Sequence, residues 1–257
     1  MTPSKKVLVE RQGPVLIIRI NRPEVRNAID TEVSNGIASA MDELDQSASL
    51  RVGVIAGVGN SFSAGMDLKA FVGGETPMIQ GRGLGGITES PPKKPLIGAA
   101  QGWALGGGLE LLLACDLIVA DTSTQLGFPE VRRSLIAAAG GVMLLPDRIP
   151  FAIAMEMLFT GEPIDAHRAT DLGLVNRLVP SGQSLETALN LANVVAANGP
   201  LAVVGTKEIV NRRREWPIAD RWRKQREISD PINRSDDARE GAAAFREGRT
   251  PTWGLPE

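Results

Sequence analysis

Apolar positions in the first part of the chain follow two different spacings. Residues 7–10 and 15–20 are β-branched apolar runs joined by Arg-Gln-Gly-Pro, a pattern typical of a β-hairpin. Residues 27–44 instead carry apolar side chains at helical spacing, which predicts a helix. Short apolar runs predict further buried strands at 52–56, 96–101, 117–120 and 175–179. Strands that alternate with helices in this way favour the α/β class.

The C-terminal part of the chain has a different pattern. Helical spacing is found at 108–115, 131–145 and 151–159, between the predicted strands, but from about residue 184 to residue 246 it is the only pattern. We therefore predict an α/β core over residues 1–183 and a helical region over residues 184–257. The last eight residues, 250–257, are expected to be extended.

One internal segment departs from both spacings. Residues 73–95 contain six glycines and four prolines and few large apolar side chains. Loops of this length and composition are often mobile or functional. We interpret the segment as a candidate lid or disordered loop.

Composition places the chain among ordinary globular proteins. Of its 257 residues, 43% are hydrophobic and 23% are charged, and the net charge of -2 gives no sign of nucleic-acid binding. Cys115 is the only cysteine, so an intrachain disulfide is excluded and a reducing compartment fits. The N-terminus lacks a signal-peptide core, and no run reaches the roughly 20 apolar residues of a membrane span. We expect a soluble, cytoplasmic protein without membrane contact.

The most informative segment is a glycine turn. Gly106, Gly107 and Gly108 run directly into an apolar helix-like stretch, and Glu110 follows two residues later. Glycine lets backbone N–H groups approach a ligand closely, and a helix start leaves its first N–H groups unpaired. Such a turn can hold negative charge on a substrate oxygen. A carboxylate within an apolar run is costly unless it is used or paired.

Two further segments fit the same chemistry. The loop 61–69 is rich in small residues and follows a predicted strand, so its backbone could supply a second N–H donor, although alone it reads as an ordinary turn. Pro129 places Glu130 near a helix start, where a carboxylate also stabilises the helix dipole. Together with Glu110, this residue would complete a pair of carboxyl groups for acid–base chemistry on a water molecule.

These segments together resemble the crotonase superfamily, which contains enoyl-CoA hydratases and isomerases. The resemblance extends over nearly the whole chain, in order. It rests on Asn21-Arg22-Pro23, Asn27-Ala28, residues 62–68, residues 102–110, Cys115-Asp116, Phe128-Pro129-Glu130, residues 154–157, 160–162, Ala166, residues 173–176, Glu240-Gly241, Phe245 and Arg249.

The resemblance implies roles for particular residues. The backbone N–H groups of Met66 and Gly107 would form an oxyanion hole for the thioester oxygen, and Glu110 and Glu130 would be catalytic. Coenzyme A, which is part of the substrate rather than a separate cofactor, would be bound by Arg26, Ala28, Ala64, Gly65, Met66, Asp67, Leu68, Gly106 and Gly107. The implied fold is a spiral of ββα units. The C-terminal helices would support oligomerisation and cover the CoA, in a homotrimer or homohexamer.

The first interpretation is an enoyl-CoA hydratase that adds water reversibly to a 2-enoyl-CoA. An enoyl-CoA isomerase and a carnitinyl-CoA-type dehydratase are alternatives within the family, because residues 132–141 depart from the family pattern where they would shape the acyl pocket. A non-catalytic acyl-CoA-binding protein is an alternative of another class. Two carboxylates favour water chemistry over isomerisation, because an isomerase needs only one base. They also argue against a binding protein, which gains nothing from charge near an acyl chain.

Other polar features have simpler explanations. Residues 207–226 hold eight Lys or Arg against three acids, which predicts a solvated helix face or, alternatively, a surface that attracts CoA phosphates. His167 is the only histidine, and no cluster has metal-ligand spacing, so no metal site is expected.

Overall fold

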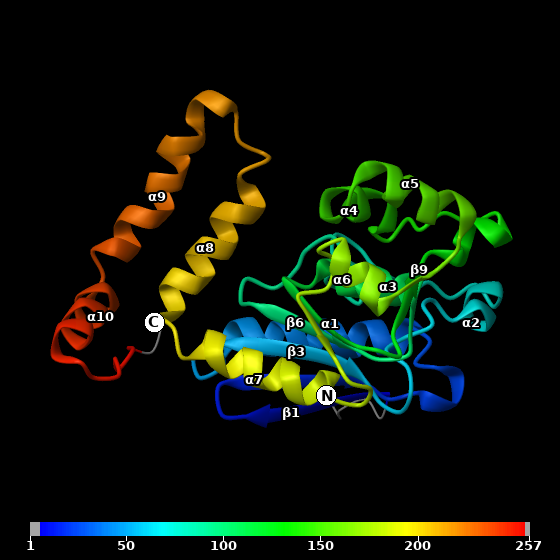
Figure 1. The fold of residues 1–257 in the computed structure, drawn as a ribbon, viewed down its shortest axis with the longest axis horizontal. Coiled ribbons are helices and arrows are strands. Elements are labelled where there is room, and N and C mark those ends of the chain that lie inside the picture. Colours follow the sequence, from blue (N-terminus) through cyan, green and yellow to red (C-terminus); the bar gives the residue numbers. More distant parts are fainter. Residues whose placement is uncertain (1–5, 255–257) are drawn as a thin grey trace.

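The computed structural model describes residues 6–254, and its centre is a six-stranded sheet of order β1-β2-β3-β6-β8-β11 (Figure 1). The first two strands pair antiparallel as the predicted hairpin, and every later neighbour is parallel. The strands are β1 (Val7–Gln12), β2 (Val15–Ile20), β3 (Val52–Gly57), β6 (Leu96–Ala100), β8 (Leu117–Asp121) and β11 (Arg177–Val179).

The sheet is buried on both faces, which explains why its strands are continuous apolar runs. Along β2, Leu16 and Ile18 point into the main core, whereas Val15 and Ile17 point to the opposite face. Helix α7 (Ser184–Ala196) covers that opposite face with alanines spaced four residues apart, which allow a helix to lie close to the strands.

A small second sheet creates the repeated path of the fold. It has the order β10-β9-β7, with β10 (Ile164–Asp165), β9 (Gln125–Gly127) and β7 (Trp103–Leu105). The chain passes from β6 to β7 and then into α3 (Gly107–Ala114), and again from β8 to β9 and into η2 (Pro129–Arg133). After β3, Ser63 bridges to Ala104 of β7 before α2 (Leu68–Val72). This confirms the predicted spiral of strand, strand and helix.

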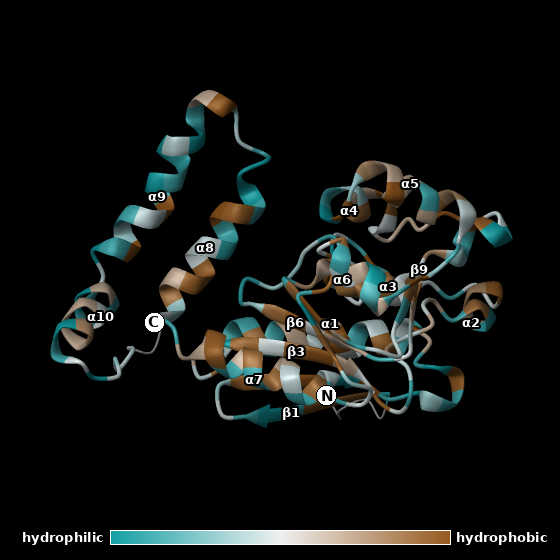
Figure 2. Cartoon of the chain, in the orientation of Figure 1, coloured by the Kyte–Doolittle hydropathy of each residue, from teal (hydrophilic) through white to brown (hydrophobic). Residues whose placement is uncertain are grey.

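The remaining elements complete the body and an arm. The body contains η1 (Pro23–Val25), α1 (Thr31–Gln46), β4 (Met78–Ile79), β5 (Gly83–Leu84), α4 (Gly141–Arg148), α5 (Phe151–Thr160) and α6 (Ala166–Asp171). The arm contains α8 (Pro200–Arg212), η3 (Ile218–Asp220), α9 (Arg221–Asn233) and α10 (Asp236–Glu247). Figure 1 shows α8 and α9 standing away from the sheets, and Figure 2 shows that α9 is largely hydrophilic whereas the strands are hydrophobic.

The arm is anchored by one lysine of the predicted basic face. The Lys207 side chain is only 9% exposed, and its Nζ lies 2.6 Å from Asp116 Oδ2 and 2.9 Å from the Lys94 carbonyl oxygen. The prediction that Lys207 belongs to a solvated face, or meets CoA phosphates, is therefore wrong. Tertiary packing places it against the end of α3 instead.

Two segments differ from their predicted structure. The segment 73–95 is not a disordered loop, because it forms β4 and β5 and buries Leu84 and Ile87 in the main core. Three of the glycines that suggested mobility, Gly83, Gly85 and Gly86, serve close packing; a Cβ on Gly85, for example, would lie 2.8 Å from Leu111.

The predicted helix over 131–145 is also wrong in its first half. The chain forms η2, leaves it at Ser134 with φ 53°, and enters α4 only after Gly140, whose φ is 131°. These left-handed positions break the helix, so residues between them form a loop. The other predicted helices and strands are confirmed with small shifts at their ends; α1, for example, begins at Thr31 because the Asp30 carboxylate caps it.

The described part of the chain ends in a segment without regular structure. Residues 250–254 belong to no helix or strand, and residues 255–257 of the predicted extended tail lie outside the described residues. Within the described part, no single helix is long and apolar enough to cross a membrane; α7 and α8 reach that length only as a pair, bent by 106°.

Candidate active site

The structure brings the two predicted N–H donors together. A Cβ added to Gly107 would lie 3.4 Å from the Met66 nitrogen, so the two backbones are in contact. Within residues 6–254 neither the Met66 nor the Gly107 amide donates a hydrogen bond to a protein acceptor. Two adjacent amides without acceptors are the geometry required to hold a developing oxyanion.

Glycine is required on both sides of this amide pair. Gly65 has φ +91°, and a Cβ there would lie 2.7 Å from the Leu105 carbonyl oxygen and 2.9 Å from the Gly107 nitrogen. Gly108 packs as closely, because its Cβ would lie 2.4 Å from the Ser63 carbonyl oxygen. The glycine turn therefore allows close backbone approach, as its sequence predicted.

Gly106 brings the second carboxylate to the turn. It adopts φ 54° and ψ -126°, and a Cβ there would lie 2.7 Å from Glu130 Oε1. Only a residue without a side chain lets this carboxylate approach the backbone beside the amide pair. Residues twenty-four positions apart in the sequence thus meet at one site.

Glu110 is buried and partly satisfied by backbone. Its side chain is on α3, its exposure is 3%, and its Oε1 accepts a hydrogen bond of 2.9 Å from the Gly141 amide. Burial raises the pKa of Glu110 to about 7, the Glu130 charge adds to this, and hydrogen bonds from the Gly141 and Ala139 amides oppose it. The effect of burial on the pKa of Glu110 is therefore larger than the opposing effect of the helix start. The sequence alone did not decide between these two effects.

The pKa of Glu130 is affected by burial in the same direction as that of Glu110. Burial raises its pKa, while its own backbone amide and the charge of Arg133 act in the other direction. Its Oε2 is buried and has no hydrogen-bond partner within residues 6–254. An unsatisfied buried carboxylate oxygen is costly, so it indicates a site built for a polar ligand atom.

An apolar pocket of about 380 Å³ adjoins Glu130. Glu130 is its one charged lining residue, and side chains of η2, α4 and α5 form most of its wall. The other lining residues are Phe128, Val131, Ile136, Ala137, Val142, Pro146, Phe151, Met155, Leu158 and Phe159. This pocket includes the segment at which the sequence departs from the family pattern, and it suits a hydrocarbon group.

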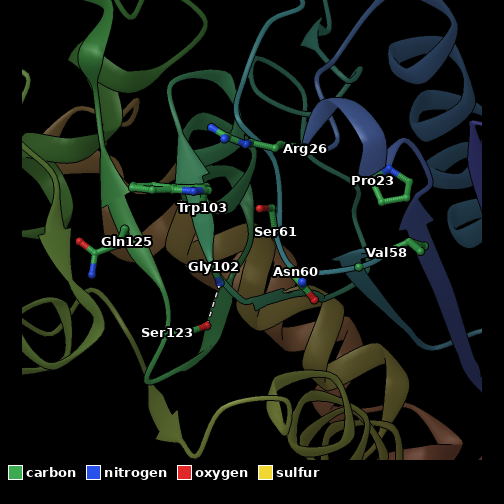
Figure 3. Close-up of a pocket in the computed structure, with 10 residues that line it drawn as sticks. Pro23, Arg26, Val58, Asn60, Ser61, Gly102, Trp103, Ser123 and Gln125 are labelled. Carbon is green, nitrogen blue, oxygen red and sulfur yellow. Dashed lines mark hydrogen bonds between the residues drawn. The ribbon is translucent and has the colours of Figure 1, made fainter.

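A second pocket, of about 490 Å³, contains Arg26, which was predicted to bind CoA (Figure 3). It lies where β7 and β9 begin, and Figure 3 shows Arg26 and Trp103 on the same side of it. Its lining residues are Pro23, Arg26, Val58, Gly59, Asn60, Ser61, Gly102, Trp103, Ser123 and Gln125. Arg26 is exposed there, so its guanidinium is accessible to an anionic group.

Apart from Gly106 and Gly107 of the glycine turn, the other predicted CoA residues come from two loops that pair with each other. The Ala64 amide donates to the Arg26 carbonyl oxygen over 2.9 Å, and the Ile29 amide donates to the Gly65 carbonyl oxygen over 2.8 Å. This pairing places Ala28 in the same strand-like layer as residues 64–68. The structure therefore brings predicted CoA residues from two distant parts of the sequence together.

Sequence reasoning missed the amides of Ala139 and Gly141, which hold Glu110. The Gly140-Gly141 pair was an available signal, because a glycine pair marks a turn that can expose N–H groups. Among the described residues, no group of three or more His, Cys, Asp or Glu side chains is placed to hold a metal ion.

Comparisons with known proteins show the family of the chain. Residues 10–255 match the family described as enoyl-CoA hydratase/isomerase. An enoyl-CoA hydratase of Mycobacterium tuberculosis is 36% identical over 261 residues, 96% of this chain and 95% of the relative. A carnitinyl-CoA dehydratase of Salmonella typhi is 38% identical over 258 residues, 97% of this chain and 98% of the relative.

A solved structure extends the similarity to three dimensions. The crystal structure of an enoyl-CoA hydratase from Mycobacterium tuberculosis has a TM-score of 0.96 at 52% identity, and the match covers 98% of this chain and 99% of that chain. The similarity therefore extends over the sheets, the glycine turn and the C-terminal helices.

Proposed function

Since the chain belongs to the enoyl-CoA hydratase/isomerase family, we propose that Glu110 and Glu130 add water to a 2-enoyl-CoA whose carbonyl oxygen is bound by the Met66 and Gly107 amides. The relatives support an enoyl-CoA hydratase enzyme that acts on acyl-CoA thioesters. One observation carries the residue assignment: two buried carboxyl groups with raised pKa values converge beside an amide pair that has no acceptor among the described residues.

The amide pair stabilises the charge that develops on the thioester. As the water oxygen bonds to the β-carbon, electrons move to the thioester oxygen and an enolate-like anion forms. The N–H groups of Met66 and Gly107 bind this oxygen more strongly as its charge grows. Removing one such donor typically costs about 3 kcal/mol of barrier stabilisation.

The two glutamates divide the proton transfers. One carboxylate accepts a proton from water as its oxygen attacks, and the other carboxyl group gives a proton to the α-carbon. A proton transfer between the two groups restores the starting state. A pKa near 7 suits this exchange, because such a group both gives and accepts protons at neutral pH.

The pocket beside Glu130 favours a hydrocarbon acyl tail. Apart from Glu130 its lining is apolar, and each buried CH₂ contributes about 0.8 kcal/mol. A carnitinyl group would bring a hydroxyl and a quaternary ammonium into the same walls. We therefore propose simple 2-enoyl chains as substrates, with Arg26 and residues 64–68 holding the CoA portion.

The proposal is tested by replacing each glutamate by glutamine. Glu110→Gln and Glu130→Gln are each expected to lower kcat on a short 2-enoyl-CoA by about 100-fold or more, because each loses a proton-transfer group. Gain of one water is followed by mass spectrometry. The exposed Glu156→Gln on α5 is the matched control and should keep the wild-type rate.

The same assay separates the alternatives. Wild-type hydration by both active-site variants would overturn the assignment. Migration of the double bond without a gain of water would identify an isomerase, and turnover confined to carnitinyl-CoA would identify the specialised dehydratase. Binding of a thioester panel without any turnover would favour an acyl-CoA-binding protein.

We also propose that the C-terminal region, residues 184–257, mediates assembly into a homotrimer or homohexamer. Several apolar side chains on the arm are exposed, including Ile218, Trp222 and Phe245. Exposed apolar surface of this kind is usually covered by a partner.

A further inference from the structure

Arg22 lies outside the reacting groups, yet its guanidinium joins the two loops that shape the site. We propose that Arg22 is a positioning residue that aligns the Met66 amide by clamping Asp30 and Asp67, the residues that cap α1 and α2. This inference rests on the proposed role of Met66 as an oxyanion donor. It concerns how that donor is held, which neither the motif nor the comparisons address.

The guanidinium is mostly buried and contacts three acceptors. Its side chain is 14% exposed, and Nη2 lies 3.0 Å from Asp67 Oδ2. Nη1 donates to the Ala28 carbonyl oxygen over 2.7 Å and lies 3.1 Å from Asp30 Oδ2. One side chain thus contacts both loops, which are more than thirty residues apart in the sequence. The fork of donors allows this arrangement, since a single ammonium group could not reach three acceptors in these directions.

The second carboxylate oxygen of each aspartate caps the N-terminus of a helix. Asp67 Oδ1 accepts from the Lys69 and Ala70 amides at the start of α2, over 3.1 and 3.3 Å. Asp30 Oδ1 accepts from the Val33 amide at the start of α1 over 2.9 Å. Arg22 therefore connects two N-caps, and moving either aspartate would move a helix start.

Both aspartates are held in the charged form. Burial works to raise the pKa of Asp67, but the Ala70 amide and the Arg22 guanidinium bring it below its ordinary value. Burial also works to raise the pKa of Asp30, but Lys6, the Val33 amide and Arg22 lower it below its ordinary value. The clamp is thus a charge-assisted contact at neutral pH, which is shorter and stronger than a neutral one.

Met66 lies between two residues that this clamp restrains. The Ile29 amide donates to the Gly65 carbonyl oxygen over 2.8 Å, and the Asp67 amide donates to the Ile29 carbonyl oxygen over 2.9 Å. Both neighbours of Met66 are therefore tied to the loop that Arg22 holds through Ala28 and Asp30. The Met66 N–H donates to no acceptor within residues 6–254, and the position of this amide depends on the loop pairing.

Arg22 is itself fixed at its backbone. Its amide donates to Asn27 Oδ1 over 2.8 Å, and the Asn27 amide donates back to the Arg22 carbonyl oxygen over 2.8 Å. Asn27 also donates to the carbonyl oxygens of Val58 and Ser61. The guanidinium therefore starts from a rigid base. A rigid base is needed if the clamp is to set the position of a catalytic donor to within a fraction of an ångström.

Arg22→Lys and Asp67→Asn test the clamp. Lysine keeps the charge but loses the fork, and asparagine keeps an oxygen to cap α2 but loses the charge. We expect each to lower kcat ten- to one hundred-fold with a much smaller change in KM, because the lost alignment acts in the transition state. Arg82→Lys is the matched control: Arg82 also pairs with an aspartate, Asp42, and donates to the Gly86 carbonyl oxygen, but it contacts neither Asp30 nor Asp67.

A vibrational measurement separates positioning from mere folding. The infrared stretch of a carbonyl-labelled saturated acyl-CoA shifts to lower frequency when an oxyanion hole polarises it. We expect a clear shift in the wild-type protein and in Arg82→Lys, and a smaller one in folded Arg22→Lys and Asp67→Asn. A wild-type shift in both clamp variants, with activity lost only in proportion to unfolded protein, would overturn the clamp. No shift in the wild-type protein would instead overturn the proposed oxyanion hole.

Discussion

Glu110 shows how a single residue is set by opposing effects. Its helix start and the Gly141 amide favour the charged form, yet burial dominates and raises its pKa to about 7. Ionised Glu110 therefore lowers the free energy of unfolding of the native protein. Its charged form is less stable in the folded protein than in the unfolded chain.

The sign of this effect predicts how stability depends on pH. Below about pH 4.5 both states hold the proton, between about 4.5 and 7 the native state holds more, and above 7 both are ionised. The free energy of unfolding should therefore fall as pH rises from 4.5 to 7, by roughly 3 kcal/mol from this residue alone.

Chemical denaturation at pH 5 and pH 8 measures this loss. We expect the difference between the two pH values to shrink by most of that amount in Glu110→Gln, since glutamine does not titrate. Glu156→Gln serves as the control and should follow the wild-type pH dependence. Equal pH dependence of wild type and Glu110→Gln would contradict the raised pKa.

At the scale of elements, the start of α3 depends on the shape of the glycine turn. Gly106→Ala would place a Cβ 2.7 Å from Glu130 Oε1 and force alanine into φ 54° and ψ -126°. The carboxylate and the turn would have to separate, so we expect kcat to fall by about 100-fold, the scale of a 1 Å misplacement.

Gly173→Ala distinguishes this steric effect from backbone strain. Gly173 also has positive φ, +78°, but no atom lies within 4 Å of its Cβ position. It should lose about 1–2 kcal/mol of stability and keep the wild-type kcat per folded molecule. The idea fails if steady-state kinetics show that Gly106→Ala also keeps the wild-type kcat.

At the scale of the whole molecule, the arm is held to the body but leaves apolar side chains uncovered. Lys207 anchors α8 to Asp116, whereas Trp222 is 69% exposed and Phe245 is 90% exposed. Light scattering after size-exclusion chromatography should give the mass of a trimer or hexamer. Trp222→Asp combined with Phe245→Asp should shift the protein toward the monomer, because a buried carboxylate is costly at an interface.

The control for the arm adds a carboxylate without removing an apolar contact. Arg234→Asp alters a side chain of α9's C-cap that is 81% exposed, and it should leave the assembly unchanged. A monomeric wild-type protein would overturn the proposed assembly.

Local patterns of the chain predicted most elements. The hairpin, the buried strands and the long C-terminal helices followed from apolar spacing, which is a property of neighbouring residues. The wrong predictions came where contacts between distant residues decided. Residues 73–95 read as mobile from their glycines, but Leu84 and Ile87 are drawn into the core. Residues 131–145 read as one helix, but Ser134 and Gly140 are left-handed.

The site divides in the same way. By itself the sequence determined the family, and it indicated the glycine turn and the two candidate glutamates, because these reside in short motifs whose residue types carry the chemistry. Only the tertiary structure decided that burial dominates the pKa of Glu110, that Gly141 supports it, and that Arg22 joins two helix caps. Burial, electrostatic coupling and hydrogen bonding between distant loops depend on how the chain folds back on itself, and no local pattern encodes them.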